Sequence, residues 1–381
     1  MKGLYYRLSP FTPDSAGAAA LFADLPALII PVDMNGTVST FRGRVGIQPE
    51  SRVTVCSILG NRELSYVMGL TDDFVNECLG LMERYESEFV VLLHGPVSSM
   101  VGLDLQVLAE EIEERTGKPA LAVDCSGNEP YEKGLSAAML EVFGKLKHLE
   151  PKPYRGTYNL LGLNAIDHNS TKLRSLFAAG VERATGGECL SVWGCRDGWT
   201  QWEQARYAHE NILCSISALP LAKAMKREWG IPWRTIDSLG LCDLAIDGCD
   251  LSGLKTLVVS EQLMANIVRR PLEFCGCDVT VGTFHTLCGE YAQAQDCRID
   301  SELEFLRLLK EKRFDLVIGD AALRQLVDGK AAFAELPHSA VARGIQNQDG
   351  YAPLTESWFA SLEMRFAEAD TFSRGEIHGS R

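Results

Sequence analysis

The sequence of Glu88–Cys125, EFVVLLHGPVSSMVGLDLQVLAEEIEERTGKPALAVDC, is the strongest indication of the fold class. It begins with five apolar residues after Glu88, continues through a loop of small residues and a helix expected over about 104–116, and ends in the apolar run Ala120–Val123. Continuous apolar runs joined by a helix are typical of buried parallel strands with their crossover. Gly117 and Pro119 explain where the helix ends, because glycine favours the position past a helix and proline cannot continue one.

The same pattern recurs along the chain. Leu108–Asp124, LAEEIEERTGKPALAVD, and Leu221–Asp237, LAKAMKREWGIPWRTID, share Leu, Ala, Gly, Pro and Asp at the same offsets. Leu308–Asp320 also runs from a charged helix into a strand that ends in Asp. Any parallel α/β protein repeats such units, and several similar Rossmann-like domains in one chain would do the same.

Composition and charge limit the possible functions. The chain has 381 residues, 23% of them charged, and a formal net charge of −14. This acidic balance argues against nucleic acid or an anionic membrane as the main partner, because no basic stripe is present to release counterions. The apolar stretch Ala18–Val32 contains Asp24 and Pro26 and is too short to span a bilayer, and no signal peptide is visible, so we expect a cytoplasmic protein.

The twelve cysteines are dispersed, and no CxxC pair occurs among them. Neither a zinc ribbon nor a ferredoxin pattern is therefore present. We expect most of these cysteines to be buried core residues of a protein from a reducing, anaerobic cell. The sequence also lacks GxGxxG, GxxxxGK[ST] and GxSxG, so a built-in dinucleotide site, a P-loop or a hydrolase elbow is unsupported.

The expected fold class is α/β, with three Rossmann-like domains whose parallel sheets surround a central cleft. The first domain is predicted over 1–152, the second over 153–250, the third with a C-terminal helix over 251–371, and a frayed tail over 372–381. Pro151-Lys152-Pro153 is the best linker candidate, because two prolines flanking one residue favour extended chain.

Seven short motifs occur in a fixed order over roughly 27–340. They are Asp33…Gly36 at a strand end, Glu63-Leu64-Ser65-Tyr66-Val67-Met68-Gly69, Pro96…Gly102-x-Asp104, Ala208-x-x-Asn211, Gly230-Ile231-Pro232-Trp233, Phe314-Asp315-x-Val317-Ile318-Gly319-Asp320 and Leu336-Pro337-His338-Ser339. In this order the chain resembles the component 1 family of nitrogenase-type oxidoreductases. That family also includes tetrapyrrole reductases and cofactor-assembly scaffolds, and its three Rossmann-like domains match the repeated unit.

The resemblance implies an iron–sulfur cluster at a subunit interface, and the sequence departs from it there. The positions at which the family has two cluster-binding cysteines are Thr37 and Gly95 here. Neither a hydroxyl nor a hydrogen replaces a thiolate as an iron ligand. Cys56 is a possible substitute ligand, although a buried core position is the alternative. We therefore expect the cluster ligands to come largely from a partner chain.

The resemblance also implies a further metallocofactor or tetrapyrrole, for which Cys214 and His338 are the candidate metal ligands. The alternatives are a buried strand cysteine and a turn histidine. The helix on which nitrogenase has a proton-donating histidine reads Gly134-Leu135, so we do not expect true dinitrogen reduction. The residues predicted to bind a cofactor are Asn35, Gly36, Thr37, Gly95, Pro96, Ser98, Cys214 and His338.

The function implied is that of a subunit of a nitrogenase-like reductase complex. Low-potential electrons would come from a separate iron–sulfur ATPase, and the substrate would be a metallocofactor, a tetrapyrrole or a small unsaturated molecule. The expected partners are this reductase and a homologous component 1-type subunit, in a two- or four-chain assembly. One alternative is a non-catalytic scaffold or partner subunit, and another is a small-molecule binding protein without a redox role.

Overall fold

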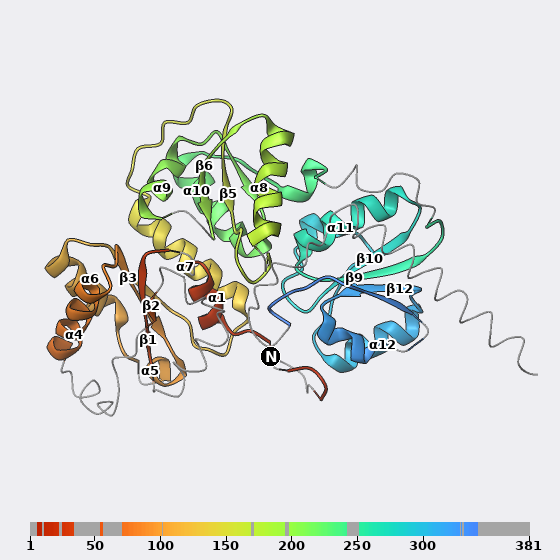
Figure 1. Cartoon of the computed structure of the whole chain (residues 1–381), viewed down its shortest axis with the longest axis horizontal. Helices are drawn as coiled ribbons and strands as arrows, with labels where there is room; N and C mark the ends of the chain where they lie inside the picture. The colour runs from red at the N-terminus through yellow and green to blue at the C-terminus, as the bar shows by residue number, and fades with distance from the viewer. Residues whose placement is uncertain are drawn as a thin grey trace, which may run out of the picture.

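The computed structural model describes residues 6–9, 11–22, 25–33, 54–55, 71–100, 102–168, 171–194, 198–241, 251–327, 329 and 331–341. Within these residues the strands form three sheets, in which every pairing is parallel. Each sheet and its helices form a lobe, and the three lobes are arranged around a centre (Figure 1). This arrangement confirms the predicted α/β fold with three parallel sheets.

The first lobe contains a sheet in the order β2-β1-β3-β4. Its elements are α1 (Asp14–Ala20), β1 (Ala27–Val32), β2 (Thr54–Val55), α4 (Thr71–Arg84), β3 (Phe89–His94), α5 (Pro96–Met100), α6 (Leu105–Thr116), β4 (Ala120–Val123) and α7 (Tyr131–Leu146). Successive side chains of a strand point to opposite faces, so the continuous apolar run of β1 is explained by burial on both sides. Ile29 packs into the core shared with α7, whereas Leu28 and Ile30 pack under α4 and α6.

The second lobe repeats the strand order of the first, β6-β5-β7-β8. Its elements are β5 (Thr157–Leu161), α8 (Thr171–Thr185), β6 (Glu188–Trp193), α9 (Trp199–Gln204), η1 (Ala205–Tyr207), β7 (Glu210–Leu213), η2 (Ile216–Ala218), α10 (Leu219–Trp229), β8 (Trp233–Thr235) and η3 (Ile236–Leu239).

The third lobe has five strands in the order β11-β10-β9-β12-β13. Its elements are β9 (Lys255–Val259), α11 (Gln262–Phe274), β10 (Asp278–Thr283), η4 (Gly289–Tyr291), β11 (Cys297–Arg298), α12 (Glu302–Lys312), β12 (Leu316–Gly319), η5 (Ala321–Leu326) and β13 (Ala332–Glu335).

The repeated sequence unit produces the same local structure twice. Helix α6 leads into β4 and helix α10 into β8, and both strands lie in parallel sheets. Gly117 and Gly230 end the two helices in the left-handed conformation, with φ of 65° and 74°. Glycine adopts this conformation without the steric cost of a Cβ atom, which explains why both repeats have it at the same offset.

Helix α7 belongs to more than one lobe. It extends over Tyr131–Leu146 and packs on α1 and β4 of the first lobe and also on α10 and η2 of the second lobe. Its close approach to α1 depends on Gly134, where a Cβ atom would lie 1.8 Å from the carbonyl oxygen of Asp14. A single apolar core therefore extends from α1 through α7 into the other lobes.

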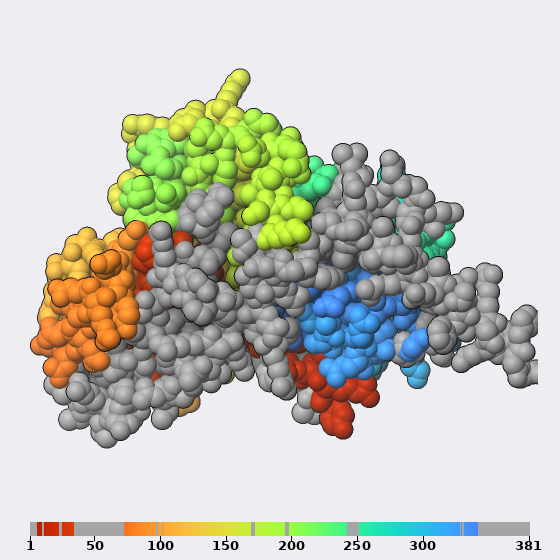
Figure 2. All heavy atoms as spheres, in the orientation of Figure 1, coloured from red at the N-terminus to blue at the C-terminus, as the bar shows by residue number. Residues whose placement is uncertain are grey.

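The N-terminal segment joins the third lobe. The backbone N–H groups of Tyr6, Arg7 and Leu8 donate to Oε2 of Glu302 at the start of α12, at 2.9–3.1 Å. Leu8 and Phe11 pack into the apolar cluster of that lobe. Figure 2 shows this segment, in red, against the blue surface of the third lobe.

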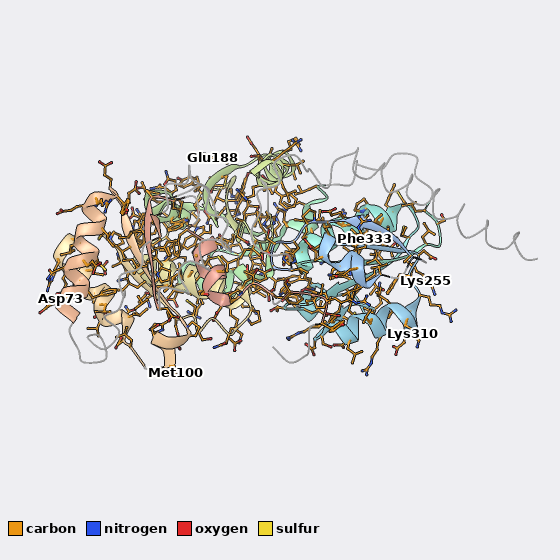
Figure 3. All side chains as sticks on the ribbon, turned by 60° about the horizontal axis from the view of Figure 1, so that its bottom comes forward. Asp73, Met100, Glu188, Lys255, Lys310 and Phe333 are labelled. Atoms are coloured by element: carbon orange, nitrogen blue, oxygen red, sulfur yellow. The ribbon has the colours of Figure 1, made fainter. Side chains whose placement is uncertain are left out.

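Figure 3 shows the described side chains on the ribbon of the three lobes. The labelled residues of that view mark the first lobe (Asp73, Met100), the second (Glu188) and the third (Lys255, Lys310, Phe333). The domain limits at 152, 250 and 371 stay a prediction, and the expected C-terminal helix lies outside the described residues. Among the helices that the structure describes, none has the length and apolarity needed to cross a membrane.

Candidate functional site

A buried hydrogen-bond network joins all three lobes. Tyr131, at the start of α7, donates from Oη to Oδ1 of Asp167 at 2.5 Å, and Asp167 follows β5 in the second lobe. Nε2 of His338, which follows β13 in the third lobe, lies 3.1 Å from the same carboxylate oxygen. The carboxyl ends of parallel strands are where open α/β sheets bind ligands. We call these residues and their neighbours the junction.

The surroundings of the network hold its two central residues in place. Asn164 donates from Nδ2 to Oδ2 of Asp167 at 2.7 Å, and Oδ2 of Asp320 accepts the backbone N–H of His338 at 3.0 Å. Burial alone would raise the pKa of Asp167, but the hydrogen bond and the charge of His338 lower it below its usual range. Asp167 is therefore an anion at neutral pH.

A second buried carboxylate, Glu261 at the start of α11, joins the second and third lobes. Its Oε1 accepts the backbone N–H of Ile216 at 2.8 Å, and its Oε2 accepts that of Met264 at 2.9 Å. Burial and the nearby charge of Asp167 raise the pKa of Glu261 well above its usual value. Both oxygens are used for hydrogen bonds to the backbone, which is a structural role.

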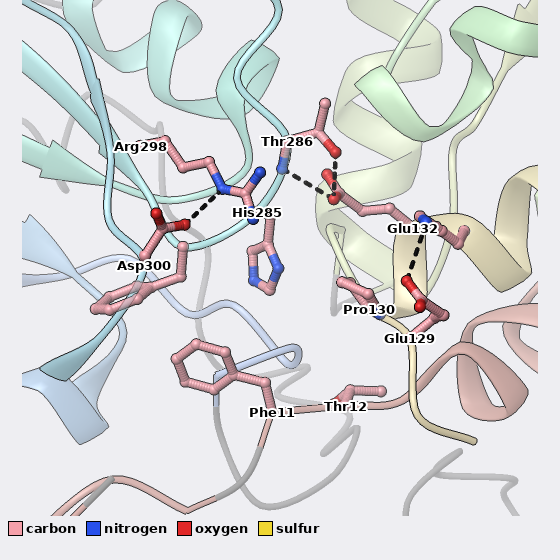
Figure 4. A pocket seen from close by; sticks show the side chains of 11 residues that line it. Phe11, Thr12, Glu129, Pro130, Glu132, His285, Thr286, Arg298 and Asp300 are labelled. Carbon is pink, nitrogen blue, oxygen red and sulfur yellow. Dashed lines mark hydrogen bonds and ion pairs between the residues drawn. The ribbon is translucent and has the colours of Figure 1, made fainter. Parts of the chain in front are cut away.

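A pocket of about 440 Å³ opens beside the junction, between α7 and the third lobe (Figure 4). It is lined by Phe11, Thr12, Glu129, Pro130, Glu132, Lys133, Phe284, His285, Thr286, Arg298 and Asp300. Its two cations are already paired, Lys133 with Glu129 at 2.9 Å and Arg298 with Asp300 at 3.0 Å. Its volume falls within the range of small-molecule sites.

Glu132 lies on the wall of this pocket. Its Oε2 accepts from the backbone N–H and the hydroxyl of Thr286, at 2.9 and 2.8 Å, which ties α7 to the third lobe. Its Oε1 is buried and has no hydrogen-bond partner in the protein. Burial raises the pKa of Glu132 to about 7, although the hydrogen bonds from Thr286 act in the opposite direction.

His285 lies between the pocket and the network. Its ring packs edge-on against Tyr131 and His338, with centroid distances of 5.0 and 5.2 Å. Burial, followed by the charge of His338, lowers the pKa of His285 to about 3, so the ring is neutral at physiological pH. Its Nε2 is buried without a hydrogen-bond partner in the protein.

The predicted cofactor-binding residues fall into separate places. Asn35, Gly36, Thr37 and Cys56 lie outside the described residues. Gly95, Pro96 and Ser98 form a corner after β3 in the first lobe, where the Gly95 N–H donates to Oγ of Ser98 at 2.9 Å. A Cβ atom on Gly95 would lie only 1.8 Å from Oδ2 of Asp33. Any larger side chain at position 95, a cysteine included, therefore has no room beside Asp33.

Cys214 and His338 are both buried, at the ends of β7 and β13. The thiol of Cys214 points back along its own strand, with Sγ 3.8 Å from the carbonyl oxygen of Ile212. The imidazole of His338 is held by Asp167, with Tyr131 Oη at 3.4 Å. The role of this pair as metal ligands stays a prediction.

The described residues do not fit an iron–sulfur cluster or a second metallocofactor. No group of three or more His, Cys, Asp or Glu side chains is placed to hold a metal ion in that part of the chain. The corner at Gly95 is closed by Asp33, and Nε2 of His338 is already used.

Most of the junction residues were not predicted from the sequence. Asp167 and His168 follow a strand in Asn164-Ala165-Ile166-Asp167-His168, and a strand-end Asp of this kind is a usable signal. Tyr131 and Glu132 occupy the first turn of a helix, and His285 and Thr286 follow a strand whose Val and Thr alternate. Their importance arises only from contacts across the lobes.

Comparison with known proteins agrees with this fold. The family described as "Nitrogenase component 1 type Oxidoreductase" matches residues 53–241. The structure described as "Nitrogenase Cp1 at pH 6.5" is 12% identical, with a TM-score of 0.71 over 100% of this chain and 96% of that chain. "Nitrogenase Cp1 at pH 5" is also 12% identical, with a TM-score of 0.66 over 95% and 89% of the two chains. No curated protein matches the sequence.

These findings define the class as an α/β protein with the nitrogenase component 1 fold. Residues 53–241 match the nitrogenase component 1-type oxidoreductase family, in agreement with the resemblance that the sequence motifs predicted.

Proposed function

We propose that this chain is a subunit of a nitrogenase-like oxidoreductase complex. In this proposal an ATP-dependent iron–sulfur reductase supplies low-potential electrons, and the complex reduces a bound metallocofactor, a tetrapyrrole or a small unsaturated substrate. The observation that carries the proposal is the family match over 53–241 within a fold shared along the whole chain.

The junction supports a reductive role. A reduction that adds electrons to an unsaturated bond also consumes protons, and proton transfer by positioned side chains is a general catalytic device. Perturbed pKa values of buried groups gather where such chemistry takes place. Glu132, Asp167 and His285 have perturbed pKa values, and Glu132 and His285 line a pocket of suitable size.

The proposal places the iron–sulfur cluster mainly on a homologous partner subunit. The packing of Asp33 against Gly95 supports this assignment, because it leaves no space for a thiolate at position 95. The complete unit would thus be a hetero- or homo-oligomer of component 1-type chains together with the reductase.

The direct test is electron transfer under anaerobic conditions. The full chain, purified with its homologous partner, is mixed with the reduced iron–sulfur reductase and MgATP, and oxidation of the reductase is followed by its absorbance. We expect oxidation that requires ATP and the partner subunit, with MgADP as the control. An absence of ATP-dependent oxidation with the assembled complex would refute the proposal.

A non-catalytic partner or scaffold subunit is the second candidate function. The observation that favours it is the closed corner at Gly95, since a chain without cluster ligands can serve to complete an oligomer. The variant Glu132→Gln separates the two functions. A catalytic subunit predicts lower turnover with an unchanged complex, whereas a scaffold predicts unchanged turnover.

Metal analysis tests whether the protein contains iron and whether Cys214 is one of its ligands. Iron and acid-labile sulfide are measured in anaerobically purified wild type and in Cys214→Ala. If metal content is the same in both, Cys214 is not a ligand. If neither the chain nor its complex contains iron, the protein is a small-molecule binding protein and not a redox subunit.

A further inference from the structure

Two buried glutamates face the junction, and they differ in one respect. Glu261 is 0% exposed and uses both carboxylate oxygens to accept backbone N–H groups. Glu132 is 5% exposed, lines the pocket, and uses only Oε2. Its Oε1 is buried without a protein partner. Buried polar atoms without partners are uncommon and call for an explanation, which includes a catalytic role.

Glu132 lies between the pocket, on one side, and the buried junction, on the other. Figure 4 shows its carboxylate at the pocket wall, bonded to Thr286 and with the ring of His285 nearby. Behind this wall, Tyr131 is its neighbour in sequence and donates to Asp167. Four further nitrogen atoms of the junction are buried without partners in the protein: Nε2 of His285, Nδ1 of His338 and both ring nitrogens of His168.

The charges around Glu132 come from each lobe. The charged and titratable groups that face it are Glu129, Tyr131 and Lys133 on its own segment, Asp167 from the second lobe, and Glu261, His285, Arg298, Asp300 and His338 from the third lobe. Lys133 and Arg298 are each paired with another carboxylate, so neither neutralises Glu132 directly. A carboxyl group in this position gains and loses its proton near neutral pH.

We propose that Glu132 is a proton carrier between the solvent in the pocket and the buried junction. The inference rests on the proposed reductive function, for which it supplies the protons. In the step, a water-borne proton from the pocket binds to a carboxylate oxygen of Glu132. The O–H bond at Oε1 then breaks, the proton passes to the unpartnered Nε2 of the neutral His285 ring, and the carboxylate of Glu132 is restored. No electron is transferred at Glu132, so the step needs no oxidant or reductant.

The first test observes the carboxyl group itself. Infrared spectra of the isolated full chain are recorded between about pH 5.5 and 8.5, without reductase or nucleotide, so failed electron transfer cannot affect the result. We expect a protonated-carboxyl band that titrates near pH 7, is absent from Glu132→Gln and is retained in Glu129→Gln. Glu129 is the matched control because it lines the same pocket and is exposed.

The same spectra test access from the pocket. On dilution into D2O the Glu132 band should shift within the mixing time, whereas the band of Glu261 should shift slowly because Glu261 lies away from the pocket. If the Glu132 band exchanges as slowly as that of Glu261, or if Glu132→Gln removes no band, the proposal is wrong.

The second test follows the proton into the junction. Exchange of the imidazole N–H protons with water is measured by NMR in the ¹⁵N-histidine-labelled full chain. We expect Glu132→Gln to slow exchange at His338 by about a hundredfold, the scale of a lost proton-transfer group. Glu129→Gln should leave the exchange unchanged. Equal exchange rates in wild type and a folded Glu132→Gln would overturn the proposal.

A second variant keeps Glu132 and tests the proposal even if Glu132→Gln does not fold. Thr286→Val removes the hydroxyl that donates to Oε2 of Glu132 and therefore destabilises the ionised form of Glu132. The infrared titration midpoint and the midpoint of the exchange-rate profile should both rise, by about one pH unit. A purely structural Glu132 would leave the exchange profile unmoved, and that result would also reject the proposal.

Discussion

Two corners lie at corresponding strand ends of the first and second sheets, but only the second contains a network of polar side chains. The first lies between β1 and β3, where Asp33 packs against Gly95. The second follows β5 and β7, where Asp167 reaches His338 and the backbone of Ile216 meets Glu261. The strand order is the same in both lobes, so topology alone does not decide which corner carries polar chemistry.

A polar site in this fold requires side chains from more than one lobe. At the first corner the described contact is between a carboxylate and a residue without a side chain, so the space is filled from within one lobe. At the junction each lobe supplies a polar group that the others lack: Tyr131, Asp167 and His338. Buried polar groups require partners, so the network favours one relative position of the lobes.

The largest expected effect is the loss of the shared carboxylate. Asp167→Ala leaves Tyr131, His338 and Asn164 without their acceptor in a buried site. Removing one partner of a buried pair typically costs about 3–5 kcal/mol, and we expect a loss of that size in the free energy of unfolding. Urea denaturation measures it. Asp167→Asn is the control and should lose less stability, because its amide oxygen still accepts a hydrogen bond. A loss below about 1 kcal/mol in Asp167→Ala would show that the network does not stabilise the junction.

The next effect is a dependence of the free energy of unfolding on pH that comes from His285. The pKa of His285 is lowered to about 3, below its unfolded value of about 6.5, so the unfolded state binds the proton first as pH falls. Stability is therefore lost on acidification from about pH 6.5, by roughly 3 kcal/mol at about pH 4.5. His285→Phe keeps the ring contacts with Tyr131 and His338 and should remove this part of the loss. Urea denaturation at several pH values tests it, and parallel curves for the two proteins would contradict the assignment.

Glu132 acts in the opposite direction in the same experiment. Its folded pKa of about 7 exceeds the unfolded value, so the folded state holds the proton more tightly and stability falls as pH rises from about 4.5 to above 7. Glu132→Gln should remove a decrease of roughly 3 kcal/mol over that range. The stability of wild type minus that of Glu132→Gln isolates this contribution, since His285 and His168 are common to both proteins.

The local elements could be predicted from the sequence, whereas the junction could not. The apolar run of β3, Asp104 at the start of α6 and Gly117 at its end are neighbours in sequence, and local rules determine their structure. The contact between Tyr131 and His338 joins residues 207 positions apart, and Glu302 binds a segment 294–296 positions away. No periodicity encodes such pairings, because they follow from how complete lobes pack.

The family motifs could also be recognised from the sequence, because they too are local. They describe turns at strand ends, such as Gly230-Ile231-Pro232 between α10 and β8, where the backbone conformation restricts the residue type. The ligand roles attached to Cys214 and His338 depend on what faces those turns. His338 faces Asp167, a residue that no motif included. The alternating Val and Thr of β10 give no continuous apolar run, so the rule that identifies β3 from the sequence does not identify this strand.

The smallest expected effect tests the closed corner. Gly95→Ala places a Cβ atom 1.8 Å from Oδ2 and 2.5 Å from Cβ of Asp33, so one of the two residues must move. Overpacking of this kind typically costs about 1–3 kcal/mol, and we expect that loss in the free energy of unfolding. Asp33→Gly removes the three atoms nearest to the new methyl group, Oδ2, Cγ and Cβ of Asp33, which makes it the matched background.

The double-mutant cycle isolates the contact between the two positions. Gly95→Ala should cost about 1–3 kcal/mol in wild type and less than about 0.5 kcal/mol in Asp33→Gly, so the two changes are strongly coupled. Such coupling would mean that Asp33 fills the place in which the family has a cysteine side chain. Equal costs in both backgrounds would mean that another obstacle closes the corner, and the assignment of the cluster ligands to a partner subunit would lose its structural support.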